Sequence, residues 1–146
     1  MTFEELLRQR RVAAEPPGPD EIAQLRALAR RCLADAAIEM MSPEGRFQQA
    51  YGAARALATI VVRASGYRAR QPGAHYNTFL ALEAAERGTF STHAAYFDIC
   101  RTVRNELSYD NPEGVSETEL KEILRLVPEF KRAVDSWLAR HHPEFA

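Results

Sequence analysis

The sequence predicts an all-α protein, folded as an antiparallel up-and-down four-helix bundle with short additional helices. Apolar residues recur at the three- and four-residue spacing of buried helix faces, and cap and stop signals separate the segments. The alternation typical of strands is found nowhere. The segments are joined by short connections, which favour antiparallel neighbours.

The first 15 residues are expected to form an appended helix. Thr2 and Glu5 have the spacing of a capping box, and the proline-rich stretch EPPGP at residues 15–19 cannot continue a helix. Residues 16–19 are therefore predicted to be a linker, and residues 20–142 the helical bundle domain.

The next two helices begin with clear signals. Asp20 caps a helix whose apolar stripe continues to Ala36, and Ser42 followed by Pro43 is a typical start of another. The second of these helices buries an apolar face and ends at Gly66, which can adopt the left-handed conformation. Residues 67–73 are predicted to be a loop, and a brief helix follows and closes near Gly88.

The last two main helices are predicted at residues 91–110 and from residue 116 onward. Ser91 is expected to cap the first, and Ser116 with Glu119 forms a second capping box. Because Pro128 falls within the final apolar run, a kink or a break is expected there.

The helix over residues 91–110 is predicted to have two different faces. At 100° per residue, one stripe is an apolar core face, made of Tyr96, Ile99, Cys100, Val103 and Leu107. The other presents Phe97, Arg101, Arg104 and Ser108, with Asn105 and Tyr109 around its edge. Paired guanidinium groups beside amide and hydroxyl groups are suited to bind phosphate or carboxylate, or to orient a partner chain. The alternative is a solvated face, with a local pair between Arg101 and Asp98.

Length and composition indicate an ordinary folded domain. A chain of 146 residues with 46% apolar and 27% charged residues needs no metal or disulfide to build a core. The two cysteines are interpreted as small core residues. No apolar run is long enough for a membrane span, and the charged N-terminus does not fit a signal peptide. A cytoplasmic location away from the membrane is therefore expected.

The net charge of −1 excludes a globally basic nucleic-acid binder, but the charge is unevenly distributed. Residues 45–82 contain no acidic residue and five arginines, namely Arg46, Arg55, Arg63, Arg68 and Arg70. Arg55, Arg63 and Arg68 are candidates for a positive surface shared with Arg101 and Arg104.

Several familiar chemistries have no motif here. The sequence has no Glu-x-x-His pair for a di-iron site, no glycine-rich phosphate loop and no Cys-x-x-Cys. No metal site and no cofactor are predicted. His75 and His93 each lie near a helix start and are interpreted as surface or capping residues.

The chain resembles the HEPN domains, helical bundles of prokaryotic toxin–antitoxin and defence systems. The resemblance rests on AYGAAR at residues 50–55, the loop end GYR at residues 66–68, His75, and above all RTVRNELSYD at residues 101–110. It covers most of residues 20–140. It implies a homodimer in which these helices form a shared cleft.

In the members of that family that cut RNA, the motif is an Arg, four to six residues, and then a His. Arg104 matches the Arg and Asn105 the polar residue after it, but Tyr109 stands at the position of the His. A Tyr with a pKa near 10 is a poor base at neutral pH, whereas a His near 6.5 can shuttle protons. The resemblance therefore implies a degenerate member. The related toxin pattern with a Tyr two residues after the His also fails, because Asn111 is there.

Three functional hypotheses follow. The first is a non-catalytic homodimeric module that binds RNA or a partner protein through Arg101, Arg104, Asn105 and the Ser108–Tyr109 edge. The second is a metal-independent ribonuclease in which Arg104 and Tyr109 form a variant catalytic pair. The third is a plain protein-interaction bundle. A nucleotidyltransferase-type partner protein stays open, although modification of a Tyr by such a partner is not implied.

Overall fold

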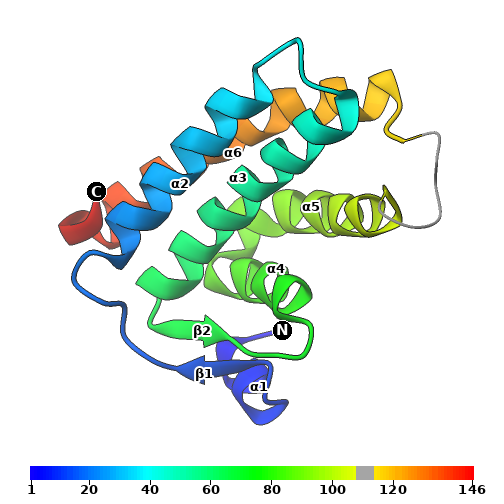
Figure 1. Cartoon of the computed structure of the whole chain (residues 1–146). Coiled ribbons are helices and arrows are strands. Elements are labelled where there is room, and N and C mark those ends of the chain that lie inside the picture. The colour runs from blue at the N-terminus through cyan, green and yellow to red at the C-terminus, as the bar shows by residue number, and fades with distance from the viewer. Residues whose placement is uncertain (108–113) are drawn as a thin grey trace.

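The protein is mostly helical, and a central helix organises it (Figure 1). The computed structural model describes residues 1–107 and 114–146. Its elements in chain order are α1 (Phe3–Arg8), β1 (Val12–Ala14), α2 (Glu21–Ala36), α3 (Pro43–Ala64), β2 (Tyr67–Ala69), α4 (Ala74–Ala85), α5 (Arg87–Leu107), α6 (Glu117–His141) and a final 3₁₀ turn (Pro143–Phe145). The predicted helical class is thus confirmed.

Helix α3 begins and ends where the sequence predicts. The Ser42 side chain accepts a hydrogen bond from the Gly45 amide at 3.0 Å, and Gly66 beyond the end has φ 94°. A Cβ at Gly66 would meet no atom within 4 Å, so its glycine is needed for backbone conformation alone.

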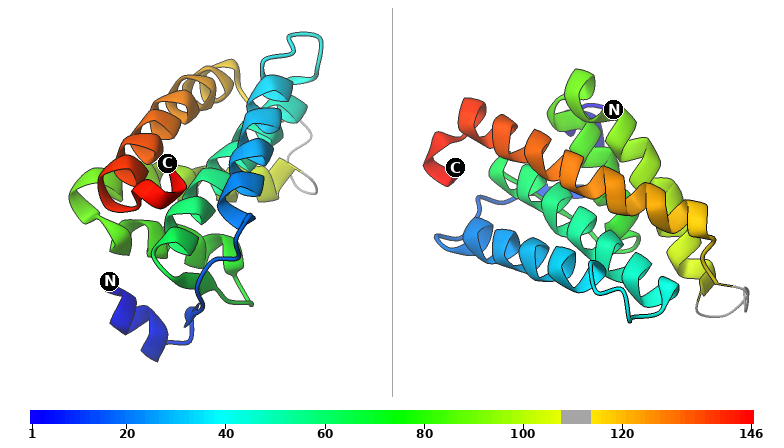
Figure 2. Two further views of the ribbon diagram at one scale, coloured as in Figure 1. Left: turned by 90° about the vertical axis from the view of Figure 1, so that its left-hand side faces the viewer. Right: turned by 90° about the horizontal axis from the view of Figure 1, so that it is seen from above.

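Helix α3 packs against α2, α4, α5 and α6. Seen from above in Figure 2, α6, α3 and α2 lie side by side, while Figure 1 shows α4 and α5 beneath them. Its buried positions are rich in alanine, which lets the neighbouring helices approach closely; among them are Ala50, Ala53, Ala54 and Ala58. This close packing brings both α4 and α5 into contact with α3.

Helix α5 departs from its predicted start and orientation. It begins at Arg87, so Ser91 lies within the helix rather than capping it. Phe97 is fully buried, whereas Ile99 is 63% exposed, so the prediction was wrong for both residues. The buried row of α5 is Phe90, Ala94, Phe97 and Cys100. The reason is that α5 packs against α4 and α3, which turns the face that continues into the arginines toward the core.

A small sheet corrects the expectation that no strand exists. Strand β1 pairs antiparallel with β2, with Val12 opposite Ala69 and Ala14 opposite Tyr67. Each strand has only three residues, too few to show an alternating pattern. The N-terminal segment is therefore a short helix and a strand that pairs with the chain after α3. Its Leu6 and Val12 are buried in a small second core with Val62 and Ala81.

Helix α6 runs continuously from Glu117 to His141 with Pro128 inside it, so the helix does not break at Pro128. Its capping box is formed as predicted: Ser116 Oγ accepts from the Glu119 amide at 3.1 Å, and the Glu119 carboxylate accepts from the Ser116 amide at 2.9 Å. Across residues 1–107 and 114–146, no helix has the length and apolar character to cross a bilayer.

Candidate functional site

Arg101 and Arg104, near the end of α5, lie against aromatic rings of the neighbouring helices. The Arg101 guanidinium carbon is 5.3 Å from the ring centre of Tyr76 on α4, and Arg101 Nε donates to Asp98 Oδ1 at 2.8 Å. The guanidinium carbon of Arg104 is 5.8 Å from the Tyr51 ring on α3. Such cation–π contacts hold a guanidinium flat and keep its edge N–H groups available. Arg101 thus has the predicted local ion pair, and Arg104 has no carboxylate partner among the described residues.

Tyr51 and His75 connect α3 to the first turn of α4. Tyr51 is only 2% exposed, and its hydroxyl is 3.1 Å from Nδ1 of His75. Gly73, with φ 78°, turns the chain so that α4 begins directly beside α3. His75 is therefore held beside Tyr51 and lines the same cavity as Arg104, whereas the sequence predicts a surface or capping residue.

Burial and the nearby arginines together shift the pKa values of His75, Tyr51 and Arg55. Burial first, and then the charges of Arg55, Arg104 and Arg101, lower the pKa of His75 to about 4. Burial raises the pKa of Tyr51 to about 12, against the opposing effect of Arg104. Burial also lowers the pKa of Arg55, and Arg104 adds to that effect. At neutral pH, the site combines three cationic arginines with a neutral imidazole and a neutral phenol.

Beside this group lies a cavity of about 320 Å³, which we call the arginine pocket. It is lined by Gln71, Gly73, Ala74, His75, Tyr76, Arg101, Arg104 and Asn105. Guanidinium, amide and imidazole N–H groups are donors that suit an anion with several oxygens, such as a phosphate. No cluster of three or more potential metal ligands occurs in the part of the chain that the structure describes.

Arg63 and Arg68 are engaged elsewhere. Arg63 is 2% exposed; its Nε donates to Glu21 Oε2 at 2.9 Å, and Nη1 donates to the carbonyls of Glu15 and Tyr67 at 2.8 and 2.9 Å. Arg63 also pairs with the Glu15 carboxylate at 3.0 Å, and Arg68 forms ion pairs with both Glu15 and Glu21. The hydrogen bond from Arg63 lowers the pKa of Glu21 to about 2. This network ties the 15–21 segment to the end of α3, so its guanidiniums are not free for the arginine pocket.

Comparisons with known protein families, with characterised proteins and with solved structures find no match to this chain.

The structure brings part of the sequence-predicted site together. Arg101, Arg104 and Asn105 line the arginine pocket, and Arg55 acts on His75 from α3. Ser108 and Tyr109 lie outside the described residues.

Sequence reasoning did not assign His75, Tyr76 and Gln71 to the site, nor the contact of Tyr51 with His75. Tyr51 and His75 stand among the residues that carry the HEPN resemblance, which is the one signal that could have placed them. Their proximity depends on how α4 packs against α3, and no local spacing encodes it.

Proposed function

We propose that this chain is a degenerate HEPN-like module that binds single-stranded RNA through the arginine pocket without routinely cutting it. Within it, α2, α3, α5 and α6 would be the four main helices of an up-and-down bundle, with α1 and α4 as short additions. The observation that carries the proposal is Arg104, whose guanidinium lies at a cavity wall beside a neutral His75, without a carboxylate partner in the described chain.

A backbone phosphate accounts best for this arrangement. Packing does not require a guanidinium at the Arg104 position, because its side chain is exposed. A phosphate there would accept from Arg104 and from Arg101, and the Asn105 amide could donate to the same group. Arginines and rings together are typical of surfaces that bind single-stranded nucleic acids. RNA is therefore favoured over a protein partner.

The second candidate, a metal-independent ribonuclease, is favoured by a specific observation. His75 supplies an imidazole beside Arg104, although the sequence has Tyr109 at the motif position. A pKa of about 4 leaves His75 neutral and able to accept a proton, but makes it a weak base. Inefficient cleavage is the most that this pair supports.

The test is a titration of the protein into a fluorescently labelled single-stranded RNA, followed by anisotropy. Arg104→Ala should weaken binding about tenfold or more, because a charge-assisted contact to phosphate is lost. Arg30→Ala, an exposed arginine on α2 outside the pocket, is the matched control and should bind like the wild type.

Equal binding by wild type and Arg104→Ala would contradict the proposal. Gel analysis of the same RNA decides on the second candidate: cleavage that disappears in both Arg104→Ala and His75→Ala would make the chain a ribonuclease. Absence of any RNA binding would favour a protein partner.

A further inference from the structure

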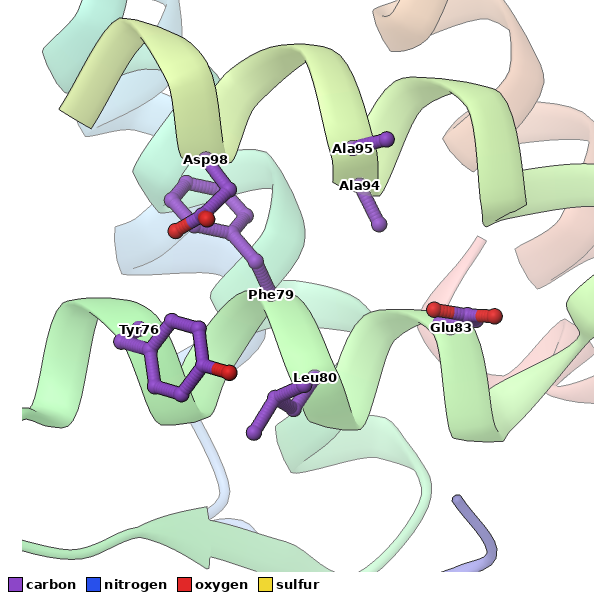
Figure 3. A pocket seen from close by; sticks show the side chains of 7 residues that line it. All are labelled: Tyr76, Phe79, Leu80, Glu83, Ala94, Ala95 and Asp98. Carbon is purple, nitrogen blue, oxygen red and sulfur yellow. The ribbon is translucent and has the colours of Figure 1, made fainter. Parts of the chain in front are cut away.

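A second cavity adjoins the arginine pocket, between α4 and α5 (Figure 3). It has a volume of about 180 Å³ and is lined by Tyr76, Phe79, Leu80 and Glu83 of α4 and by Ala94, Ala95 and Asp98 of α5. We call it the α4/α5 cavity. Tyr76 lines both cavities. Asp98, in the wall of the α4/α5 cavity, accepts a hydrogen bond from Arg101, which lines the arginine pocket. The two cavities therefore share a wall at Tyr76.

The α4/α5 cavity has the size and walls for one planar ring system. Its volume lies below the range of about 300–1,000 Å³ that is typical of pockets for drug-sized ligands. Phe79, Leu80 and the two alanines give it apolar walls, on which the faces of a heterocycle can pack. In Figure 3, Ala94 and Ala95 each present only a methyl group on the α5 side of the cavity.

Two carboxylates face this apolar space and differ in how firmly they are held. Asp98 is committed to Arg101 through its Oδ1, at 2.8 Å. Glu83 has only long contacts, 3.5 Å from its Oε1 to Ser91 Oγ and 3.7 Å to Arg87 Nε. In Figure 3, Asp98 points from α5 toward Tyr76, and Glu83 lies at the other end of the cavity. Glu83 is thus the carboxylate available to a ligand.

We infer that the α4/α5 cavity receives one base of the bound RNA strand, and that Glu83 makes guanine the preferred base. This inference rests on the proposed RNA binding and adds base selectivity to it. Guanine presents two adjacent donors, N1–H and the exocyclic N2 amino group, which match the two oxygens of one carboxylate. Uracil presents a single N–H between two carbonyl oxygens, and those oxygens would be repelled by Glu83.

The spacing of the two cavities fits a single strand lying along α5. The midpoint of Arg101 and Arg104 lies about seven residues from the middle of the α4/α5 cavity wall, or roughly 10 Å at about 1.5 Å per residue. This is the scale that separates a backbone phosphate from the base of the same or the next nucleotide. Arg101 and Arg104 line the arginine pocket, whereas Asp98 and Glu83 line the α4/α5 cavity, so the first suits a phosphate and the second the donor edge of a base.

The test compares three labelled heptamers of uridine whose central residue is uridine, guanosine or inosine, by anisotropy with the wild-type protein. Guanosine should bind about ten- to hundredfold more tightly than uridine, the range of a bidentate base contact. Inosine, which lacks the N2 amino group, should lose most of that gain. Glu83→Gln should abolish the discrimination but still bind all-uridine RNA, and Glu117→Gln, an exposed carboxylate of α6 outside both cavities, should behave as wild type.

The outcomes separate this inference from the proposed function. RNA binding without preference for guanosine, or a preference that Glu83→Gln leaves unchanged, overturns base reading by Glu83 while the RNA-binding module stands. Failure of every heptamer to bind, with Glu83→Gln folded like wild type by circular dichroism, overturns both.

Discussion

His75 shows how burial and charge can remove a histidine from its usual range of titration. Its imidazole lies beside Tyr51, and Arg55, Arg104 and Arg101 all oppose a further positive charge there. A neutral imidazole beside three guanidiniums can still accept a hydrogen bond at the nitrogen that carries no proton, and it adds no competing cation. An incoming phosphate would offset the arginine charges and raise the pKa of His75.

We expect His75 to titrate near pH 4 in the free protein and at a higher pH when inorganic phosphate or RNA is bound. Removing one of the depressing charges by Arg104→Ala should also raise its pKa. NMR of the ¹⁵N-labelled imidazole nitrogens measures both shifts. Titration of His75 close to 6.5 in the free protein would contradict the proposed packing of the site.

The lowered pKa of His75 also makes the free energy of unfolding depend on pH. Because the unfolded chain takes up the proton near pH 6.5 and the folded protein only near pH 4, stability falls as the pH drops through this window and is fully restored above it. His75→Gln should flatten this part of the urea-unfolding profile relative to wild type. An unchanged slope between pH 6.5 and 4 would show that His75 titrates alike in both states.

At the scale of elements, α5 shows why the sequence of one helix can fit two choices of buried face. The buried row Phe90, Ala94 and Phe97 continues by steps of four and three to Arg101 and Arg104. The arginines therefore prolong the core face beyond the point where the core ends, and they come to lie over the tyrosines of α3 and α4. Periodicity alone could not choose between this orientation and one turned toward Ile99, since both faces carry apolar residues.

The tie between the 15–21 segment and α3 gives a prediction about stability. Arg63→Ala should cost about 3–5 kcal/mol, because it removes the buried guanidinium that donates to Glu21 and to the carbonyls of Glu15 and Pro16. Arg68→Ala, whose side chain is 50% exposed, should cost less than about 1 kcal/mol. Urea unfolding measures both.

Equal losses for the two variants would mean that Arg63 is not the central donor of this network. If Arg68→Ala left stability intact but weakened RNA binding, Arg68 would belong to the binding surface, as the sequence analysis expects.

For the whole molecule, a net charge of −1 means that polyanion binding must come from a local surface. For single strands, each neutralised phosphate contributes about 0.7 to the slope of log K against log salt. Arg104→Ala should therefore reduce the slope by about 0.7, whereas Arg30→Ala should leave it unchanged. Anisotropy titrations at several salt concentrations measure this, and equal slopes for Arg104→Ala and wild type would remove Arg104 from the phosphate contacts.

The homodimer implied by the resemblance is a further proposal for the molecule as a whole. Two copies related by a two-fold axis would bring two α5 helices together into one cleft. Light scattering of the purified protein tests it directly. A mass of one chain, 16.4 kDa, would mean that each arginine pocket acts alone.

The sequence by itself determined the helical class, the bounds of α3 and the cap of α6. Residues such as Ser42, Pro43, Gly66 and Ser116 act on their own turn of backbone, so their effect is local and readable. It also grouped Arg101, Arg104 and Asn105 on one surface, for which we propose a role beyond packing.

Only the tertiary structure decided what these arginines face. It placed His75 beside Arg104, sealed Arg63 into a structural network, paired β1 with β2 and opened a cavity between α4 and α5. Each of these depends on contacts between segments far apart in the chain. Such contacts are set by how whole helix faces fill space against one another, and a short window of sequence does not contain that information.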